Sequence, residues 1–266
     1  MSAITQGVRD GGIVAWRNLL TVRRNTDWMF AAVIQPVMFV LLFGYVFGGS
    51  MGGAEYREFL LAGIFVQTVA FNSAFTVIGL ANDLQKGIVD RFRSLPMSRL
   101  AVLLGRTTSD LAVSVIALVV MSLCGLAIGW RIRGSLVDAV VAYLLLLLFG
   151  FAMSWVGALI GLAAPSVEVA QSAGLLWLFP VSFISPAFVS AENLPEPLRT
   201  FAEWNPFSAV IIACRDLFDN VTPAMLPQPD GWASDNALLY GTLCSIAIVA
   251  IFMPLAVAKY RRVASK

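Results

Sequence analysis

Long uncharged apolar stretches alternate with short polar ones along this chain of 266 residues. A helix needs about 20 apolar residues to cross a hydrocarbon core of about 30 Å, and six stretches reach that length without a single Asp, Glu, Lys or Arg. They are residues 28–47, 59–80, 111–129, 139–163, 169–189 and 237–258. Pro180 and Pro186 interrupt the fifth stretch, so it is expected to kink or to bend back before it leaves the membrane. The pattern predicts an all-α polytopic membrane protein, with six transmembrane helices in a single domain that covers residues 1–266.

The composition agrees with a lipid bilayer as the main surroundings. Hydrophobic residues make up 59% of the chain and charged residues 13%, whereas about 25% of the residues of a soluble domain are charged. The mean hydropathy is +0.81. Three pairs of glycines four residues apart, among them Gly157 and Gly161, favour close packing between helices.

The basic residues predict the orientation, because Lys and Arg concentrate in cytoplasmic loops. If both termini face the cytoplasm, the cytoplasmic pieces hold 13 of the 18 Lys and Arg residues. We therefore expect a multi-pass protein of the cell membrane with both termini in the cytoplasm. Fifteen Arg against three Lys favour a bacterial source with a GC-rich genome.

Two regions outside the spans carry amphipathic patterns. In residues 1–27, Ile13, Trp16 and Leu20 share a helical face beside four arginines, which predicts an N-terminal interfacial helix with either a supporting or a partner-binding role. Residues 190–236 contain six prolines, which exclude one continuous helix. Within this external region an apolar stripe is formed by Val210, Ile211, Cys214, Leu217 and Phe218, with Arg215 and Asp216 expected opposite. We expect short external helices before the last span that cap the outer mouth or dip into the leaflet, or else a packed loop.

A basic segment separates the second apolar stretch from the third. Residues 82–99 read NDLQKGIVDRFRSLPMSR, and the apolar residues that recur there at helical spacing, up to Pro96, are Leu84, Ile88, Phe92 and Leu95. Lys86, Arg91 and Arg93 flank this stripe. The segment is predicted to be a short cytoplasmic helix that either lies on the bilayer or presents its apolar face to a partner.

Most catalytic chemistry is missing from the sequence. The chain has no histidine, which excludes imidazole metal sites and Ser-His catalysis. Residues 48–52 match a nucleophile-elbow pattern but have no base available. None of the three lysines follows a Gly-rich loop, so the sequence has no P-loop for ATP. The six stretches also offer no carboxylate or basic group, which ion-coupled carriers usually hold within the bilayer. We therefore expect a permease driven by a separate motor, with no nucleic-acid partner.

The segment DLQKGIVDRFRSLPMSR resembles the cytoplasmic signature of ABC type-2 permeases, especially those grouped with the daunorubicin/doxorubicin-resistance exporters. The residues Asn205-Pro-Phe-Ser208, followed by Arg215-Asp-Leu217, are similar to that family's segment before the last span. The resemblance implies that two six-span subunits, identical or related, pair in the membrane. It also implies that each rests on a nucleotide-binding ATPase subunit that holds ATP and Mg, so that this chain binds no cofactor itself.

The resemblance further assigns a coupling helix seated in a groove of the ATPase. Its residues in this chain are Leu84, Gln85, Lys86, Gly87, Ile88, Arg91, Phe92, Arg93, Ser94, Leu95 and Pro96. A second, smaller contact falls on the turn that contains Pro165, Ser166 and Glu168. Gln85 departs from the family pattern, because many relatives carry a glutamate there that pairs with a basic residue.

The substrate implied by this group is an amphiphilic drug, antibiotic or lipid-like compound that is exported. Candidate residues along its path add polar or aromatic contacts to aliphatic surfaces, and ordinary helix packing is the alternative for each of them. They are Gln67, Phe71, Asn72, Trp177 and Phe179. The function expected from the sequence is that of a transport subunit rather than an enzyme. The competing interpretation is an ATP-independent membrane scaffold or lipid-moving protein, and an intramembrane enzyme lacks a plausible catalytic set.

Overall fold

The computed structural model describes residues 26–47, 53–87, 99–188, 190, 194–220, 222–223, 226, 229 and 231–263, without the side chains of residues 26–33, 47, 99–101 and 263. All regular elements within these ranges are helices, which confirms the predicted all-α class for the described part of the chain. The long ones are α3 (Ala54–Phe71), α4 (Ser73–Gln85), α6 (Arg99–Ala127), α7 (Leu136–Ala163) and α13 (Ala237–Val263). The shorter ones are α2 (Thr26–Leu41) with the π-helical η1 (Leu42–Phe47), α8 (Val167–Leu176), α9 (Leu178–Phe183), α10 (Glu196–Glu203), α11 (Pro206–Phe218) and α12 (Trp232–Asp235).

Four helical stretches in the described residues are long and apolar enough to cross a membrane. They are Ala54–Gln85, Val102–Ala127, Leu136–Ala163 and Ala237–Arg262. Two shorter apolar stretches, Ile34–Val46 and Val167–Phe183, coincide with the first and fifth predicted spans. The count of six spans therefore stays a prediction, whereas a polytopic membrane architecture agrees with the structure.

The ends of several helices follow from local chemistry. Ser135 and Asp138 form a capping box at the start of α7, in which each side chain accepts from the other's backbone N–H. Pro180 has no N–H to offer the carbonyl of Leu176, and the fifth apolar stretch breaks beside it, at Trp177. The predicted interruption of this stretch is thus present.

One side chain joins the end of α9 to the start of α11. The Nδ2 atom of Asn205 donates to the carbonyls of Val181 and Ile184, at 2.7 and 2.9 Å. Its Oδ1 atom accepts from the backbone N–H of Phe207, at 3.0 Å, and so caps α11. Asn205 is buried, and α11 begins with a proline at the first helical position, where a missing N–H costs nothing.

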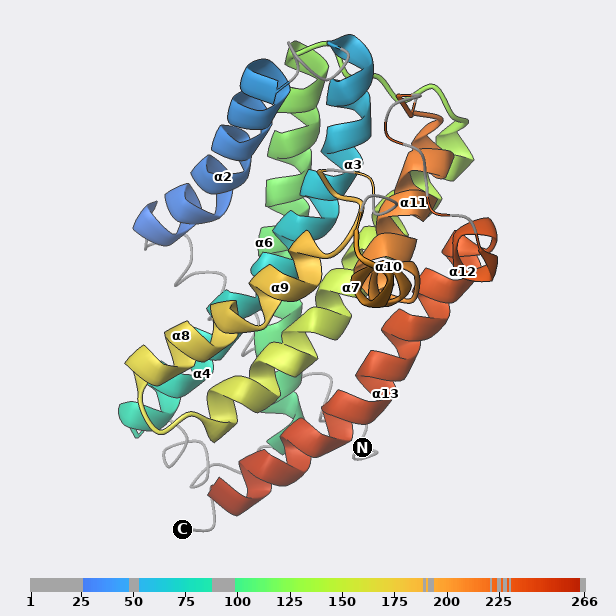
Figure 1. Ribbon diagram of the computed structural model, residues 1–266. Coiled ribbons are helices and arrows are strands. Elements are labelled where there is room, and N and C mark those ends of the chain that lie inside the picture. Colours follow the sequence, from blue (N-terminus) through green and yellow to red (C-terminus); the bar gives the residue numbers. More distant parts are fainter. Residues whose placement is uncertain are drawn as a thin grey trace.

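The α7 helix runs through the middle of the bundle, with α13 along one side and α4 along another (Figure 1). Gly157 and Gly161 allow α4 to approach closely, because a Cβ atom at either position would lie 2.6 Å from the carbonyl oxygen of Ser73 or Val77. The prediction that these two glycines are packing sites is confirmed.

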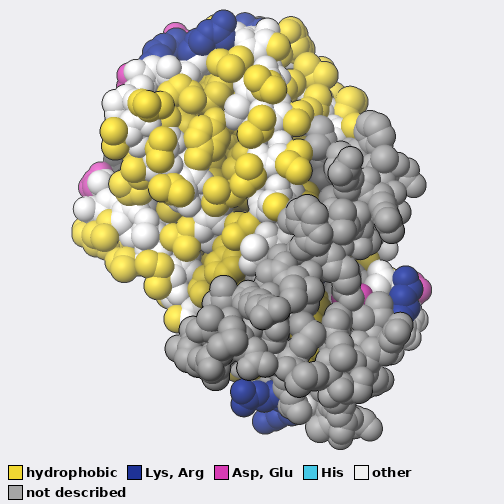
Figure 2. Space-filling model, turned by 180° about the vertical axis from the view of Figure 1, so that it is seen from behind, with side chains coloured by type: hydrophobic (Ala, Val, Ile, Leu, Met, Phe, Trp, Pro, Cys, Tyr) yellow, Lys and Arg dark blue, Asp and Glu magenta, His cyan; other side chains and the backbone are white. Residues whose placement is uncertain are grey.

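Apolar side chains remain exposed on the outside of the bundle. On α13 they include Leu239, Leu243, Ile246, Ile251 and Leu255. In Figure 2, hydrophobic side chains cover most of the described part of the face on view, and Lys and Arg side chains lie toward its two ends. An apolar band with charges beyond it is the distribution expected of a protein that sits in a bilayer.

Two expectations from the sequence need correction. The helix assigned to the third span begins at Arg99 rather than near residue 111, so a candidate span includes Arg106 and Asp110, and the idea of wholly uncharged spans is wrong for α6. Arg215 does not lie opposite an apolar stripe, because only 1% of its surface is exposed. The α11 helix is surrounded by α3, α7 and α13, and its sides are therefore buried almost all round.

Candidate functional site

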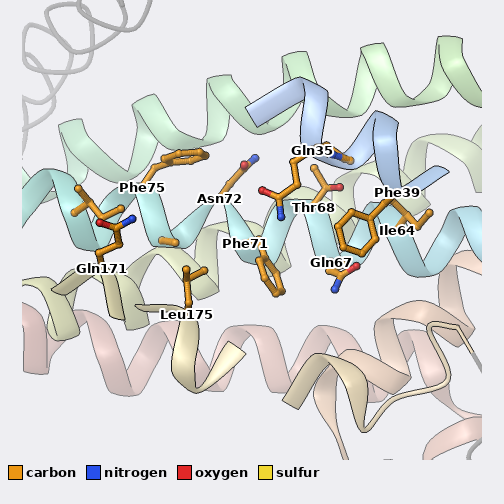
Figure 3. Close-up of a pocket in the computed structure, with 13 residues that line it drawn as sticks. Gln35, Phe39, Ile64, Gln67, Thr68, Phe71, Asn72, Phe75, Gln171 and Leu175 are labelled. Atoms are coloured by element: carbon orange, nitrogen blue, oxygen red, sulfur yellow. The ribbon is translucent and has the colours of Figure 1, made fainter. Parts of the chain in front are cut away.

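A cavity of about 230 Å³ lies between α2, α3, α4 and α8. It is placed around the junction of α3 and α4, midway along their joint stretch of apolar helix (Figure 3). The lining residues are Gln35, Pro36, Phe39, Ile64, Gln67, Thr68, Phe71, Asn72, Ala74, Phe75, Ile78, Gln171 and Leu175. None of these lining residues carries a charge.

The polar part of the lining consists mainly of carboxamides. Gln171 and Phe75 lie toward one end of the cavity, and Gln35, Thr68 and Gln67 gather toward the other (Figure 3). Gln67 is 8% exposed, and no hydrogen bond to its side chain occurs in the described part of the structure. Asn72 is also buried, and its Nδ2 atom donates to the hydroxyl of Ser114 on α6, at 3.1 Å. A carboxamide can both donate and accept, so this lining offers hydrogen bonds of both kinds without charge.

Phenylalanines supply the aromatic part of the cavity. Phe39 comes from α2, Phe71 from α3 and Phe75 from α4. The ring of Phe71 meets that of Phe179 on α9 edge to face, with their centroids 5.1 Å apart. Such contacts prefer a fixed geometry, so Phe179 supports the orientation of a cavity side chain.

A buried polar network lies beside the cavity. The Thr76 hydroxyl on α4 donates to Asp110 Oδ2 on α6, and Arg106 Nε lies 3.7 Å from the same oxygen. Arg106 Nη2 donates to the carbonyl of Phe75, at 2.8 Å, and thereby touches a cavity residue. Gly79 makes room for this guanidinium, because a Cβ atom there would overlap it. The network links α6 to the α4 wall of the cavity.

The turn after α4 lies at the same end of the bundle as the α7–α8 turn and the end of α13, toward the lower left of Figure 1. Gln85 and Lys86 are exposed, and Gly87 has a φ of 64°, which ends α4 in the left-handed conformation that glycine adopts readily. At the α7–α8 turn, Pro165 and Glu168 are exposed. Hydrogen bonds from the Ser166 side chain and from its own backbone hold the pKa of Glu168 below its usual value.

A comparison of the sequence with known protein families identifies the family of this chain. The model of the ABC-2 type transporter family matches residues 11–218. This chain belongs to the ABC-2 type transporter family.

Two of the proteins related to this ABC-2 chain are named as permeases. The daunorubicin resistance ABC transporter permease protein DrrB1 of Streptomyces coeruleorubidus is 33% identical over 249 residues, which are 92% of this chain and 84% of the relative. The O-antigen export system permease protein RfbA of Klebsiella pneumoniae is 24% identical over 198 residues, 72% of each chain. Nodulation protein J of Rhizobium leguminosarum bv. trifolii is 24% identical over 265 residues, 94% of this chain and 95% of the relative. The resemblance to the drug-resistance permeases is therefore confirmed, and the ABC-2 chain is a multi-pass membrane protein.

The structure brings only part of the predicted substrate path to the cavity. Gln67, Phe71 and Asn72 line it, whereas Trp177 and Phe179 are outside the lining. Gln35 and Gln171 add to its polar surface, although no pattern in the sequence predicts that α2 and α8 lie beside α3. The sequence did not predict the network of Arg106 and Asp110, because charged residues are usually excluded from apolar spans.

The predicted coupling residues of this ABC-2 chain fall into two groups. The amphipathic helix was expected to run from Leu84 to Pro96, but it does not begin at Leu84, because Gly87 ends α4. Leu84 instead belongs to the last turn of α4, half-buried against the cluster that includes Val102 and Trp155. The other members lie outside the described residues, namely Ile88, Arg91, Phe92, Arg93, Ser94, Leu95 and Pro96. Residues 1–25 of the predicted interfacial segment 1–27 also lie outside them.

Proposed function

We propose that this chain is the membrane-spanning permease subunit of an ATP-driven exporter. Its substrate would be an amphiphilic drug, antibiotic or lipid-like compound, taken from the cytoplasm or the inner leaflet. The observation that carries the proposal is the 33% identity, over 92% of the chain, to a permease named for daunorubicin resistance. Membership of the ABC-2 type transporter family supports the same function independently of that one relative.

The motor in this proposal is a separate nucleotide-binding ATPase, which holds ATP and Mg. A separate motor agrees with the missing P-loop in the sequence. Its contact surface would be residues 84–96 together with Pro165, Ser166 and Glu168. The exposure of Gln85, Lys86, Pro165 and Glu168 at one end of the bundle supports this assignment.

The proposed arrangement is a pair of such subunits with approximate twofold symmetry in the plasma membrane of a bacterium. Each subunit would cross the membrane six times and keep both termini in the cytoplasm. The distribution of Lys and Arg supports this orientation. The residues that line the cavity between α2, α3, α4 and α8 would then form part of the wall of the substrate path.

Copurification tests the proposal against its rival, an ATP-independent scaffold or lipid-moving protein. The tagged chain is coexpressed with a candidate ATPase from the same organism, and both are reconstituted in lipid. We expect the two proteins to copurify, and we expect ATP hydrolysis by the complex and none by the purified chain alone. Export activity that persists with a hydrolysis-deficient ATPase would favour the rival.

A further inference from the structure

Gln67 is a buried amide that faces a cavity instead of a protein partner. Its side chain is 8% exposed, and within the described residues it makes no hydrogen bond. Figure 3 shows it among the residues that line the cavity. The amide opens into the cavity and is not sealed inside the protein, so water or a ligand group there can supply its hydrogen bonds.

The groups around Gln67 extend the same chemistry. Gln35 and Gln171 contribute two more carboxamides from α2 and α8, and neither makes a hydrogen bond within the described part of the chain. Asn72 uses its Nδ2 atom on Ser114, which leaves its Oδ1 atom as an acceptor. These groups are matched by ligand hydroxyl groups, which both donate and accept, and by ligand carbonyl groups, which accept from the amide N–H.

The same lining is poorly suited to a charged group. It includes no Lys or Arg to neutralise a phosphate or carboxylate and no Asp or Glu to neutralise a cation. Arg106 and Asp110, beside the cavity, pair with each other. A charged group that enters such a site loses its hydration without gaining a counter-ion, which is strongly unfavourable.

We propose that the cavity binds the uncharged, hydroxyl- or carbonyl-bearing part of an amphiphile, with Gln67 as a central contact, and that it discriminates against anionic headgroups. Phe39, Phe71 and Phe75 provide the apolar and aromatic surface on which the rest of that part packs. The inference rests on the proposed function, because it names the chemical class of the substrate that this permease would move.

Two photoreactive probes that differ only in their headgroup test the inference. Dodecyl β-glucoside and dodecyl phosphate, each with a diazirine near the head, are added to the full chain and its ATPase in phosphatidylcholine nanodiscs. Labelling of α2, α3, α4 and α8 is measured by mass spectrometry as a function of the mole fraction of probe. We expect half-saturation by the glucoside at a mole fraction about tenfold lower than that of the phosphate, which corresponds to one or two neutral hydrogen bonds.

Two substitutions connect this preference to the cavity. Gln67→Leu keeps the size and removes the amide, and it is expected to weaken glucoside labelling about tenfold while phosphate labelling changes little. Gln171→Lys adds a cation at an exposed lining position and is expected to strengthen phosphate labelling about tenfold. Ser172→Lys, at an exposed position outside the lining, is the matched control and should leave both probes unchanged.

The outcomes separate this inference from the proposed function. Equal labelling by both probes, or unchanged glucoside labelling in both cavity variants, overturns the inference. If the ATPase still copurifies and hydrolyses ATP in that case, the proposed function stands. If the ATPase does not associate at all, the proposed function fails whatever the probes show.

Discussion

The hydroxyl of Thr76 donates a hydrogen bond of 2.5 Å to Oδ2 of Asp110, across the interface between α4 and α6. Asp110 is buried, and Arg106 shares the same oxygen from one turn earlier on α6. A buried carboxylate needs such partners because it has lost its hydration. The pair therefore fixes α4 to α6, the two helices that come directly before and after the segment proposed to meet the ATPase.

Thr76→Val should destabilise the protein by about 1–2 kcal/mol, because Asp110 keeps its burial and loses one partner. Thermal unfolding of the detergent-purified chain measures the change. Thr108→Val, at an exposed position on α6, makes the same substitution without that loss and should behave as wild type. Equal melting temperatures for both variants would show that the hydroxyl contributes nothing.

Arg215→Lys should destabilise the protein by about 2–3 kcal/mol although it keeps the charge. The guanidinium donates to the carbonyls of Phe59, at 3.0 Å, and of Pro186, at 2.5 Å, and stacks on the Phe59 ring with 3.4 Å to its centroid. An ammonium group cannot reproduce this planar, two-sided contact. Arg199→Lys is the control, because Arg199 is exposed and, among the described residues, its side chain pairs with Glu203 alone. A similar melting temperature for the two variants would contradict the prediction.

Gly161→Leu should disrupt the contact between α7 and α4. A Cβ atom at Gly161 would lie 2.6 Å from the backbone oxygen of Val77, which cannot move aside as a flexible side chain could. We expect a loss of about 1–3 kcal/mol or more, seen as a lower yield and a lower melting temperature. Ala163→Leu, exposed on the same helix, adds a similar volume and should be tolerated. Normal folding of Gly161→Leu would mean that the two helices can separate at little cost.

Phe92→Asp should release the ATPase while the permease still inserts and folds. A charge placed in an apolar groove is desolvated, and the loss of a buried aromatic anchor costs about 2 kcal/mol or more of binding, about thirtyfold in affinity. Copurification with the ATPase measures the effect, and Phe92→Leu should retain most of the binding. If Phe92→Asp recruits the ATPase and transports normally, the coupling assignment is wrong.

Cysteines introduced at Met97 and at Pro227 should report opposite sides of the membrane. In intact cells, a membrane-impermeant maleimide is expected to label Pro227→Cys and to spare Met97→Cys until the cells are opened. The native Cys124, Cys214 and Cys244 are replaced first to remove background labelling. Labelling of Met97→Cys in intact cells would reverse the proposed orientation.

Apolar length and glycine spacing predicted a large part of the fold. The helices from Leu136 to Ala163 and from Ala237 to Val263 follow directly from uninterrupted apolar runs. Gly157 and Gly161 predicted a close contact because their spacing leaves one side of a helix without side chains. These signals are local, so a single sequence is enough to read them.

Burial of charge was the part that local patterns could not predict. Arg215 was predicted to lie opposite an apolar stripe, yet its guanidinium donates to the carbonyls of Phe59 and Pro186, which are 156 and 29 residues away along the chain. Arg106 and Asp110 were assigned to a loop by their charge alone, although their spacing of four residues is that of an intrahelical pair. The cavity likewise unites Gln35, Gln67 and Gln171, which only the packing of α2, α3 and α8 brings together.

The side chain of Asn205 anchors the later part of the fifth apolar stretch. Its Nδ2 atom holds the last carbonyls of α9, and its Oδ1 atom holds the first turn of α11, which is itself enclosed by α3, α7 and α13. α9 therefore cannot move without either moving the buried helix α11 or breaking the three hydrogen bonds of Asn205. On the other side of the break at Trp177, α8 is held instead by its packing against α4 and α7. Because Gln171 lies on α8, the part of the cavity wall that it forms is fixed by α4 and α7 and not by Asn205.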